Sequence, residues 1–114
     1  MALVRVGALP EGALDAAAGF HAQVLPQLRE AFAGSGEDLA LVFAPANHEH
    51  RAWRLAAVQQ LAREHAPIRV NGIETDDEEA LAAALAYVQN APGLTGHLLR
   101  LDRNGAGALL SGST

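Results

Sequence analysis

The sequence contains no cysteine and no lysine, and it has few aromatic residues. Without cysteine, the chain cannot form disulfide bonds, use a thiolate in catalysis or hold a metal through sulfur. All 8 basic residues are arginine, so chemistry that needs a lysine amine is excluded as well. Aromatic residues make up only 4% of the chain, which predicts a core built on close backbone approach.

Long hydrophobic runs and an excess of positive charge are also missing. No apolar run reaches the roughly 18 residues that a membrane-spanning helix needs, and the amino-terminal residues do not resemble a signal peptide. We therefore expect a cytoplasmic protein with no membrane partner. The formal net charge is −5. An acidic domain does not attract phosphate backbones, so we do not expect nucleic acid as a partner.

Short apolar runs alternate with segments of helical periodicity. We place one domain at residues 1–105 and a mobile tail at residues 106–114. The predicted strands are Leu3–Leu9, Leu39–Phe43, Ile68–Ile73 and Leu98–Leu101. The predicted helices are Ala13–Ala33, Glu49–His65 and a segment from Thr75 to about Asn90. This alternation predicts an α/β fold, with a parallel sheet of about four strands and three main crossover helices.

Local signals refine two of these helices. Pro26 lacks a backbone donor, so it predicts a kink or a division within Ala13–Ala33, which ends at residues 34–36. Thr75 with Glu78 three residues later fits a capping box. Four carboxylates at Asp76–Glu79 then lie at the positive end of the helix dipole, and capping explains them better than cation binding does.

The pair of histidines in His48-Glu49-His50 is the most suggestive cluster. It follows a predicted strand, at the end where α/β proteins bind ligands. His48 and His50 supply two metal ligands, whereas a stable site needs three or four. A solvated loop or a helix cap is the favoured interpretation, and a metal or acid–base role is the alternative.

Other candidates have similarly plain explanations. A single tryptophan in an apolar helix, Trp53, indicates core packing or an interface rather than stacking on a ligand. For Arg51, Arg54 and Arg63, a solvated helix face is the favoured interpretation and an anion-binding site is the alternative.

Four short motifs occur in order along the chain. They are Val24-Leu-Pro26, the helical segment Arg54–Pro67, Ile-Arg-Val-Asn-Gly-Ile at Ile68–Ile73, and Leu-Thr-Gly-His-Leu-Leu-Arg-Leu-Asp at Leu94–Asp102. Together they resemble the carboxyl-terminal half of the short-chain dehydrogenase/reductase family. The resemblance implies a partial, truncated Rossmann-like fold containing the family's last four strands. It also implies that the final helix crosses to the opposite sheet face by a left-handed connection, an exception to the usual rule.

The residues that perform the family's chemistry have no counterparts here. The glycine-rich dinucleotide turn is missing, and Gly105-Ala-Gly107 is only a weak look-alike. Alignment puts Arg51 and Leu55 at the positions of the catalytic tyrosine and lysine, or His50 and Arg54 after a slip of one residue. The only tyrosine, Tyr87, lies in another helix, and the catalytic serine falls near Ala44-Pro45. We therefore predict no catalytic, cofactor-binding or metal-binding residue, and no NAD(P) cofactor.

The resemblance favours a non-catalytic association module. In the family, the helices that match Ala13–Ala33 and Glu49–His65 pair with those of a second subunit in a four-helix bundle. Small residues at the contact would allow close approach, namely Ala17, Ala18, Ala52, Ala56 and Ala57. We expect a homo-oligomer, most simply a dimer, with a full-length dehydrogenase as an alternative partner. The alternative functions are an oxidoreductase by descent and a small-ligand or metal site at His48 and His50.

Overall fold

The computed structural model describes residues 1–101 and contains one parallel sheet of four strands. The strands lie side by side in chain order as β1 (Ala2–Arg5), β2 (Leu39–Phe43), β3 (Val70–Glu74) and β4 (Leu98–Arg100). Every neighbouring pair is parallel, which confirms the predicted α/β fold. The predicted tail at residues 106–114, and the domain boundary before it, lie outside the described residues.

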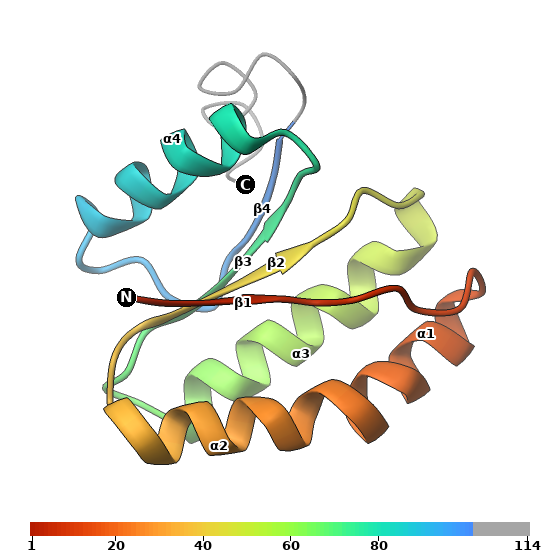
Figure 1. Ribbon diagram of the computed structural model, residues 1–114, viewed down its shortest axis with the longest axis horizontal. Coiled ribbons are helices and arrows are strands. Elements are labelled where there is room, and N and C mark those ends of the chain that lie inside the picture. Colours follow the sequence, from red (N-terminus) through yellow and green to blue (C-terminus); the bar gives the residue numbers. More distant parts are fainter. Residues whose placement is uncertain (102–114) are drawn as a thin grey trace.

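Helices cover both faces of this sheet (Figure 1). The helical segments are α1 (Ala13–Gly19), the π-helical η1 (Phe20–Val24), α2 (Leu25–Ser35), the 3₁₀ turn η2 (His48–His50), α3 (Arg51–Glu64) and α4 (Glu78–Gln89). The α1–α2 stretch and α3 lie on one face, and α4 lies on the other (Figure 1). All three connections advance in the same direction across the sheet. Because α4 lies on the other face, the connection through α4 is left-handed, whereas the other two are right-handed. The family resemblance predicted this arrangement.

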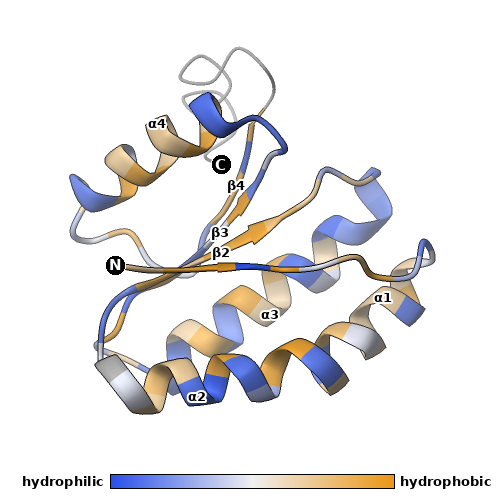
Figure 2. Ribbon diagram, in the orientation of Figure 1, coloured by the Kyte–Doolittle hydropathy of each residue, from blue (hydrophilic) through white to orange (hydrophobic). Residues whose placement is uncertain are grey.

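The central strand β2 explains how the two faces form two cores. All five of its residues are buried. Leu39, Leu41 and Phe43 pack against α1–α3, whereas Ala40 and Val42 pack against α4. Successive strand side chains point to opposite faces, so a strand covered on both sides needs a continuous apolar run. Figure 2 shows this run as a hydrophobic strand through the middle of the sheet.

The first long helical stretch divides close to Pro26, as predicted, but not at the proline itself. Pro26 lies in the first turn of α2, which follows η1 without a break. The irregular part is the preceding π-helical turn, in which the Leu25 N–H donates to the Phe20 carbonyl. Gly36 then ends α2 in the left-handed conformation, at φ 67°.

The predicted capping box at Thr75 is wrong. Thr75 is buried and still pairs with β2, because its N–H donates to the Phe43 carbonyl at 3.1 Å. Its hydroxyl accepts from the Asp77 N–H, and the Asp77 carboxylate accepts from the Glu79 N–H, so Asp77 is the N-cap of α4. The strand therefore extends further than predicted, and the helix begins at Glu78. Glu78 is in the first turn, where it pairs with Arg5 at the end of β1.

Candidate functional site

A cavity of about 550 Å³ lies at the carboxyl ends of β1 and β2. The segments after these strands form two of its walls, η2 contributes His50, and the first turn of α3 contributes Arg54. We call it the carboxyl-end cavity. Ligand sites of open α/β sheets form at this end of the strands, so this cavity is the main candidate for a binding or active site.

The His50 side chain in this cavity has both ring nitrogens engaged. Nε2 lies 2.8 Å from the Glu11 carbonyl, and Nδ1 accepts from the Trp53 indole N–H at 3.1 Å. With Nδ1 as an acceptor, Nε2 is the nitrogen that donates its N–H to the Glu11 carbonyl. His50 is only 5% exposed, so the predicted solvated loop is wrong for this residue. Neither nitrogen can take a metal or a substrate proton without breaking one of these hydrogen bonds.

Trp53 follows its predicted packing role. Its ring lies 5.4 Å from the Phe20 ring and 6.0 Å from the Phe43 ring, centre to centre. The three rings join η1, β2 and α3 in one cluster. Within this cluster, the indole N–H also orients His50.

Arg54 is buried, which contradicts the predicted solvated helix face. Its side chain is 7% exposed, and Nη1 donates to the Glu74 carboxylate at 2.7 Å and to the Ala44 carbonyl at 2.8 Å. The guanidinium lies over the Phe43 ring, 4.8 Å from its centre. Its buried Nε has no hydrogen-bond partner among the described residues.

Glu74 joins Arg54 to a second arginine. Parallel pairing places Phe43, Glu74 and Arg100 side by side in the last row of the sheet. The second oxygen of Glu74 accepts from Arg100 Nε at 3.2 Å. Two guanidinium groups thus share one carboxylate. This cluster was not predicted; its signal in the sequence is an acidic residue, Glu74, directly after the predicted strand Ile68–Ile73.

The structure distinguishes the two alignments of the catalytic tyrosine and lysine that the sequence left open. His50 and Arg54, one helical turn apart, line the carboxyl-end cavity. Arg51 and Leu55 line a different hollow, between α3 and the edge strand β4, which we call the α3–β4 groove. The alignment that is slipped by one residue, with His50 and Arg54, is therefore the one whose residues lie at the carboxyl ends of the strands.

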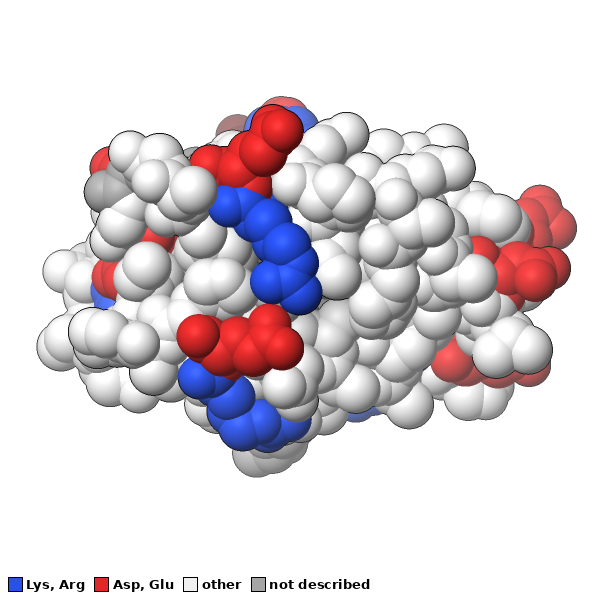
Figure 3. Space-filling model, turned by 90° about the horizontal axis from the view of Figure 1, so that it is seen from below, with Lys and Arg blue, Asp and Glu red and all other residues white. Residues whose placement is uncertain are grey.

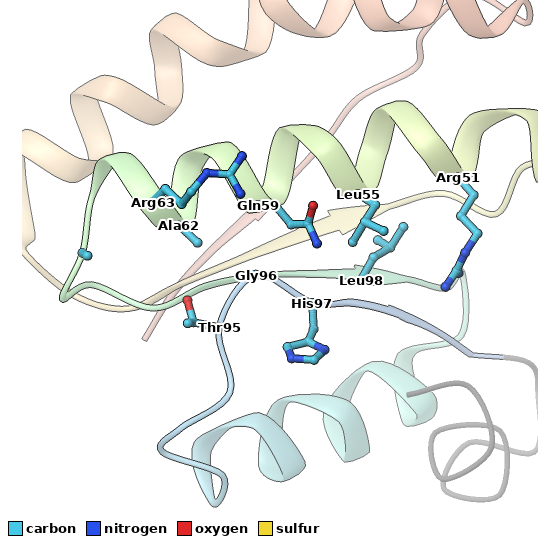
Figure 4. A pocket seen from close by; sticks show the side chains of 10 residues that line it. Arg51, Leu55, Gln59, Ala62, Arg63, Thr95, Gly96, His97 and Leu98 are labelled. Carbon is cyan, nitrogen blue, oxygen red and sulfur yellow. The ribbon is translucent and has the colours of Figure 1, made fainter. Parts of the chain in front are cut away.

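The α3–β4 groove has a volume of about 660 Å³. Leu55 and Leu98 face each other across it, and His97 points away from α3 toward the α4 side (Figure 4). Arg51 and Arg63 lie on its α3 wall. Its lining includes no acidic side chain, so it offers neither paired carboxylates nor a metal site.

Within residues 1–101, no group of three or more histidine or acidic side chains could hold a metal ion. His48 is exposed and His50 is engaged inside the protein, so the two do not form a shared site. No helix of the same residues is long and apolar enough to span a membrane.

The motifs that carry the family resemblance meet at the opposite, amino end of the strands. Arg69 donates to the Asp38 carboxylate from its backbone N–H and from Nε, both at 2.9 Å, and its Nη1 donates to the Val88 and Ala91 carbonyls. The Val70 N–H donates to the Thr95 hydroxyl. These hydrogen bonds join the start of β3 to the segment that follows α4.

Asn71 completes the same set of ties. Its buried amide donates to the Leu94 carbonyl and accepts from the His97 N–H. Gly96 adopts φ 74°, which favours glycine, and donates to the Val70 carbonyl at 2.7 Å. The polar residues of the motifs Ile68–Ile73 and Leu94–Asp102 thus form structural hydrogen bonds within the described residues, away from the carboxyl-end cavity.

Comparison with known proteins agrees with the motifs and the fold. The model of the SDR-like family, described as short chain dehydrogenase-like protein, matches residues 4–101. No curated protein and no solved structure matches the chain. The matched residues include every helix described above, β2 to β4 and the last two residues of β1, and the chain belongs to the short chain dehydrogenase-like family.

Proposed function

We propose that this member of the short chain dehydrogenase-like family is a non-catalytic association module that forms a homodimer through α1, η1 and α3. The observation that carries the proposal is the exposure of apolar residues on these neighbouring helices. Leu14 on α1 is 85% exposed, which is unusual for a leucine in a chain of this size. A second copy of the same surface would cover it.

Small residues surround Leu14 on this surface. Ala18 and Ala22 follow it at intervals of four residues, and both are exposed. Ala52 and Ala56 form a second exposed pair on α3, which contacts α1. Residues four apart share a helix face, so two stripes of small side chains lie on one side of the molecule. Short side chains permit the close helix approach that a four-helix contact needs.

The charge distribution on this side agrees with an interface. Figure 3 views the molecule from the side of α1–α3 and shows a band of charged groups, a further set of acidic groups at one end, and an uncharged area between them. The ion pair between Arg29 on α2 and Glu64 on α3, at 3.8 Å, belongs to this layer. A charged rim beside an uncharged centre is common in protein interfaces.

One predicted contact residue does not belong to this surface. Ala57 is 7% exposed and packs in the core beneath α3, so it does not support association. Ala17 is half-buried, and the exposed stripes consist of the other small residues.

The carboxyl-end cavity supports a non-catalytic role. The two residues at the family's tyrosine and lysine positions are His50 and Arg54, and both are held by internal hydrogen bonds. General acid–base catalysis needs a group that can exchange a proton with the substrate. The chain contains no lysine, and Tyr87 lies on α4, on the other face of the sheet.

Sedimentation equilibrium tests the dimer directly. We expect the wild-type chain to be dimeric at micromolar concentration, and Leu14→Glu and Ala56→Glu to be monomeric because each would bury an unpaired charge. The matched control is Ala82→Glu, an exposed alanine on α4, which should leave the dimer intact. A monomeric wild-type chain, or dimeric Leu14→Glu, would contradict the proposed interface.

Two further measurements address the alternatives. Mixing with a full-length dehydrogenase of the same family would reveal hetero-association, and the same two variants should abolish it. Reduction of a carbonyl compound by the purified chain with a pyridine nucleotide would contradict the non-catalytic role and favour an oxidoreductase.

A further inference from the structure

We infer that the carboxyl-end cavity binds a small apolar monocarboxylate through Arg54. This inference is independent of the proposed association, because the cavity and the exposed stripes of α1 and α3 are different surfaces. It rests on three observations: an uncompensated positive charge, an unpartnered buried donor, and a hollow with apolar walls beside them.

The charge count around Arg54 is the first observation. Among the residues that the structure describes, Arg54 and Arg100 share one carboxylate, that of Glu74, which leaves one positive charge in this cluster. Arg100 is 39% exposed and is solvated, whereas Arg54 is 7% exposed and is not. Burying a charge without full compensation is unfavourable. One monoanion beside Arg54 would bring the cluster to two positive and two negative groups.

The second observation is the geometry of the guanidinium. Both hydrogen bonds to Glu74 and Ala44 leave from Nη1. Nε is buried and has no partner among the described residues, although buried donors are nearly always paired. A carboxylate can engage arginine through two parallel N–H···O hydrogen bonds. Arg54 is also among the residues that line the cavity, so its guanidinium is the group beside the hollow to which a carboxylate would bind.

The third observation is the lining of the cavity, which defines the rest of the ligand. Val6, Leu9, Ala16, Phe43 and Pro45 give it apolar walls. Its volume of about 550 Å³ is in the usual range for small-molecule pockets. Glu11 is the one acidic residue in the lining and is exposed. Arg54 is the one arginine in this lining, so a second negative charge on the ligand would have no such partner, which selects a monoanion with an apolar body.

Benzoate is a suitable probe, with benzamide as its neutral counterpart of the same shape. In a ¹H–¹⁵N NMR titration of the full chain, we expect saturable shifts of the amides at residues 7–11 and 44–47 and of the Arg54 Nε–H. Benzamide should bind at least roughly tenfold more weakly, since it lacks the charge-assisted hydrogen bonds. Equal affinity for the two compounds, or no saturable shift with benzoate, would overturn the inference.

Variants test whether Arg54 is the group that binds. Arg54→Lys keeps a positive charge near Glu74 but loses the planar fork, so benzoate affinity should fall roughly tenfold or more. Arg63→Met removes an exposed arginine from the same helix and should leave the affinity unchanged. Unchanged affinity in Arg54→Lys, or shifts centred on Arg63 or Arg100, would contradict the site. If Arg54→Lys fails to fold, the Nε–H signal of the wild-type chain decides.

Discussion

Arg54 Nη1 and Glu74 Oε2 lie 2.7 Å apart, in an ion pair whose side chains are each 7% exposed. Arg54 comes from the first half of α3, and Glu74 is the last residue of β3. The pair thus fixes the rotation of α3 above the sheet, at the point where the family's catalytic lysine is expected. The ion pair joins the first half of α3 to the end of β3.

Removal of one partner from this pair should be strongly destabilising. We expect Arg54→Met to cost about 3–5 kcal/mol in the free energy of unfolding, because Glu74 would remain buried beside only one arginine. The double variant Arg54→Met/Glu74→Gln should recover part of this loss. Urea unfolding followed by circular dichroism gives both values, and a single-variant cost of under about 1 kcal/mol would show that the pair is not structurally important.

The loss of folding stability at acidic pH should depend on Asp38. The pKa of Asp38 is lowered below its usual value of 3.8, mainly because its carboxylate accepts a hydrogen bond from the backbone N–H of Arg69. Burial raises this pKa, and the Arg69 side chain lowers it further. A carboxyl whose pKa is lower in the folded state stabilises the fold fully above pH 3.8, and this contribution is lost as the pH falls through the lowered pKa.

The Asp38→Asn variant tests this dependence. It should be less stable than the wild type at neutral pH, and the difference should shrink as the pH falls below 3.8. Asp15→Asn, on an exposed residue of α1, is the control and should change the profile little. Denaturant unfolding at a series of pH values measures both. A stability difference that grows toward low pH would contradict the assigned role of Asp38.

Gly72 is expected to tolerate no side chain. A Cβ at this position would lie 2.9 Å from Leu98 Cδ1 and 3.0 Å from Val58 Cγ2. Gly72→Ala should therefore cost about 1–3 kcal/mol through overpacking between α3 and the sheet. Gly7→Ala is the control, because a Cβ there meets nothing within 4 Å. Thermal unfolding of the two variants compares them, and equal midpoints would show that the core adjusts freely.

Trp53 should contribute both packing and a hydrogen bond. Trp53→Phe keeps most of the ring contact but leaves the buried Nδ1 of His50 without its donor, a loss of about 1–2 kcal/mol. Trp53→Ala also opens a cavity next to Phe20 and Phe43 and should cost about 3 kcal/mol. Chemical unfolding separates the two effects. Equal losses in both variants would mean that the hydrogen bond dominates over packing.

Several features of the fold could be predicted because they depend on residues close together in the chain. The apolar run Leu39–Phe43 coincides with β2, and the other strands lie within a few residues of their predicted positions. The prediction at Thr75 was wrong because a local capping pattern competed with pairing to β2, which only the assembled sheet supplies. His50 was misplaced for the same reason, since its partner Glu11 lies 39 residues away in the chain.

By itself, the sequence determined the order of strands and helices and the family. It also excluded lysine and cysteine chemistry, because composition and short-range periodicity are independent of tertiary contacts. The tertiary structure alone decided that Arg54 is buried and which residues face the carboxyl-end cavity. The burial of a side chain depends on which part of the sheet packs against which turn of a helix. Arg54 and Glu74 are 20 residues apart in the chain and come together only when β3 has formed beneath α3.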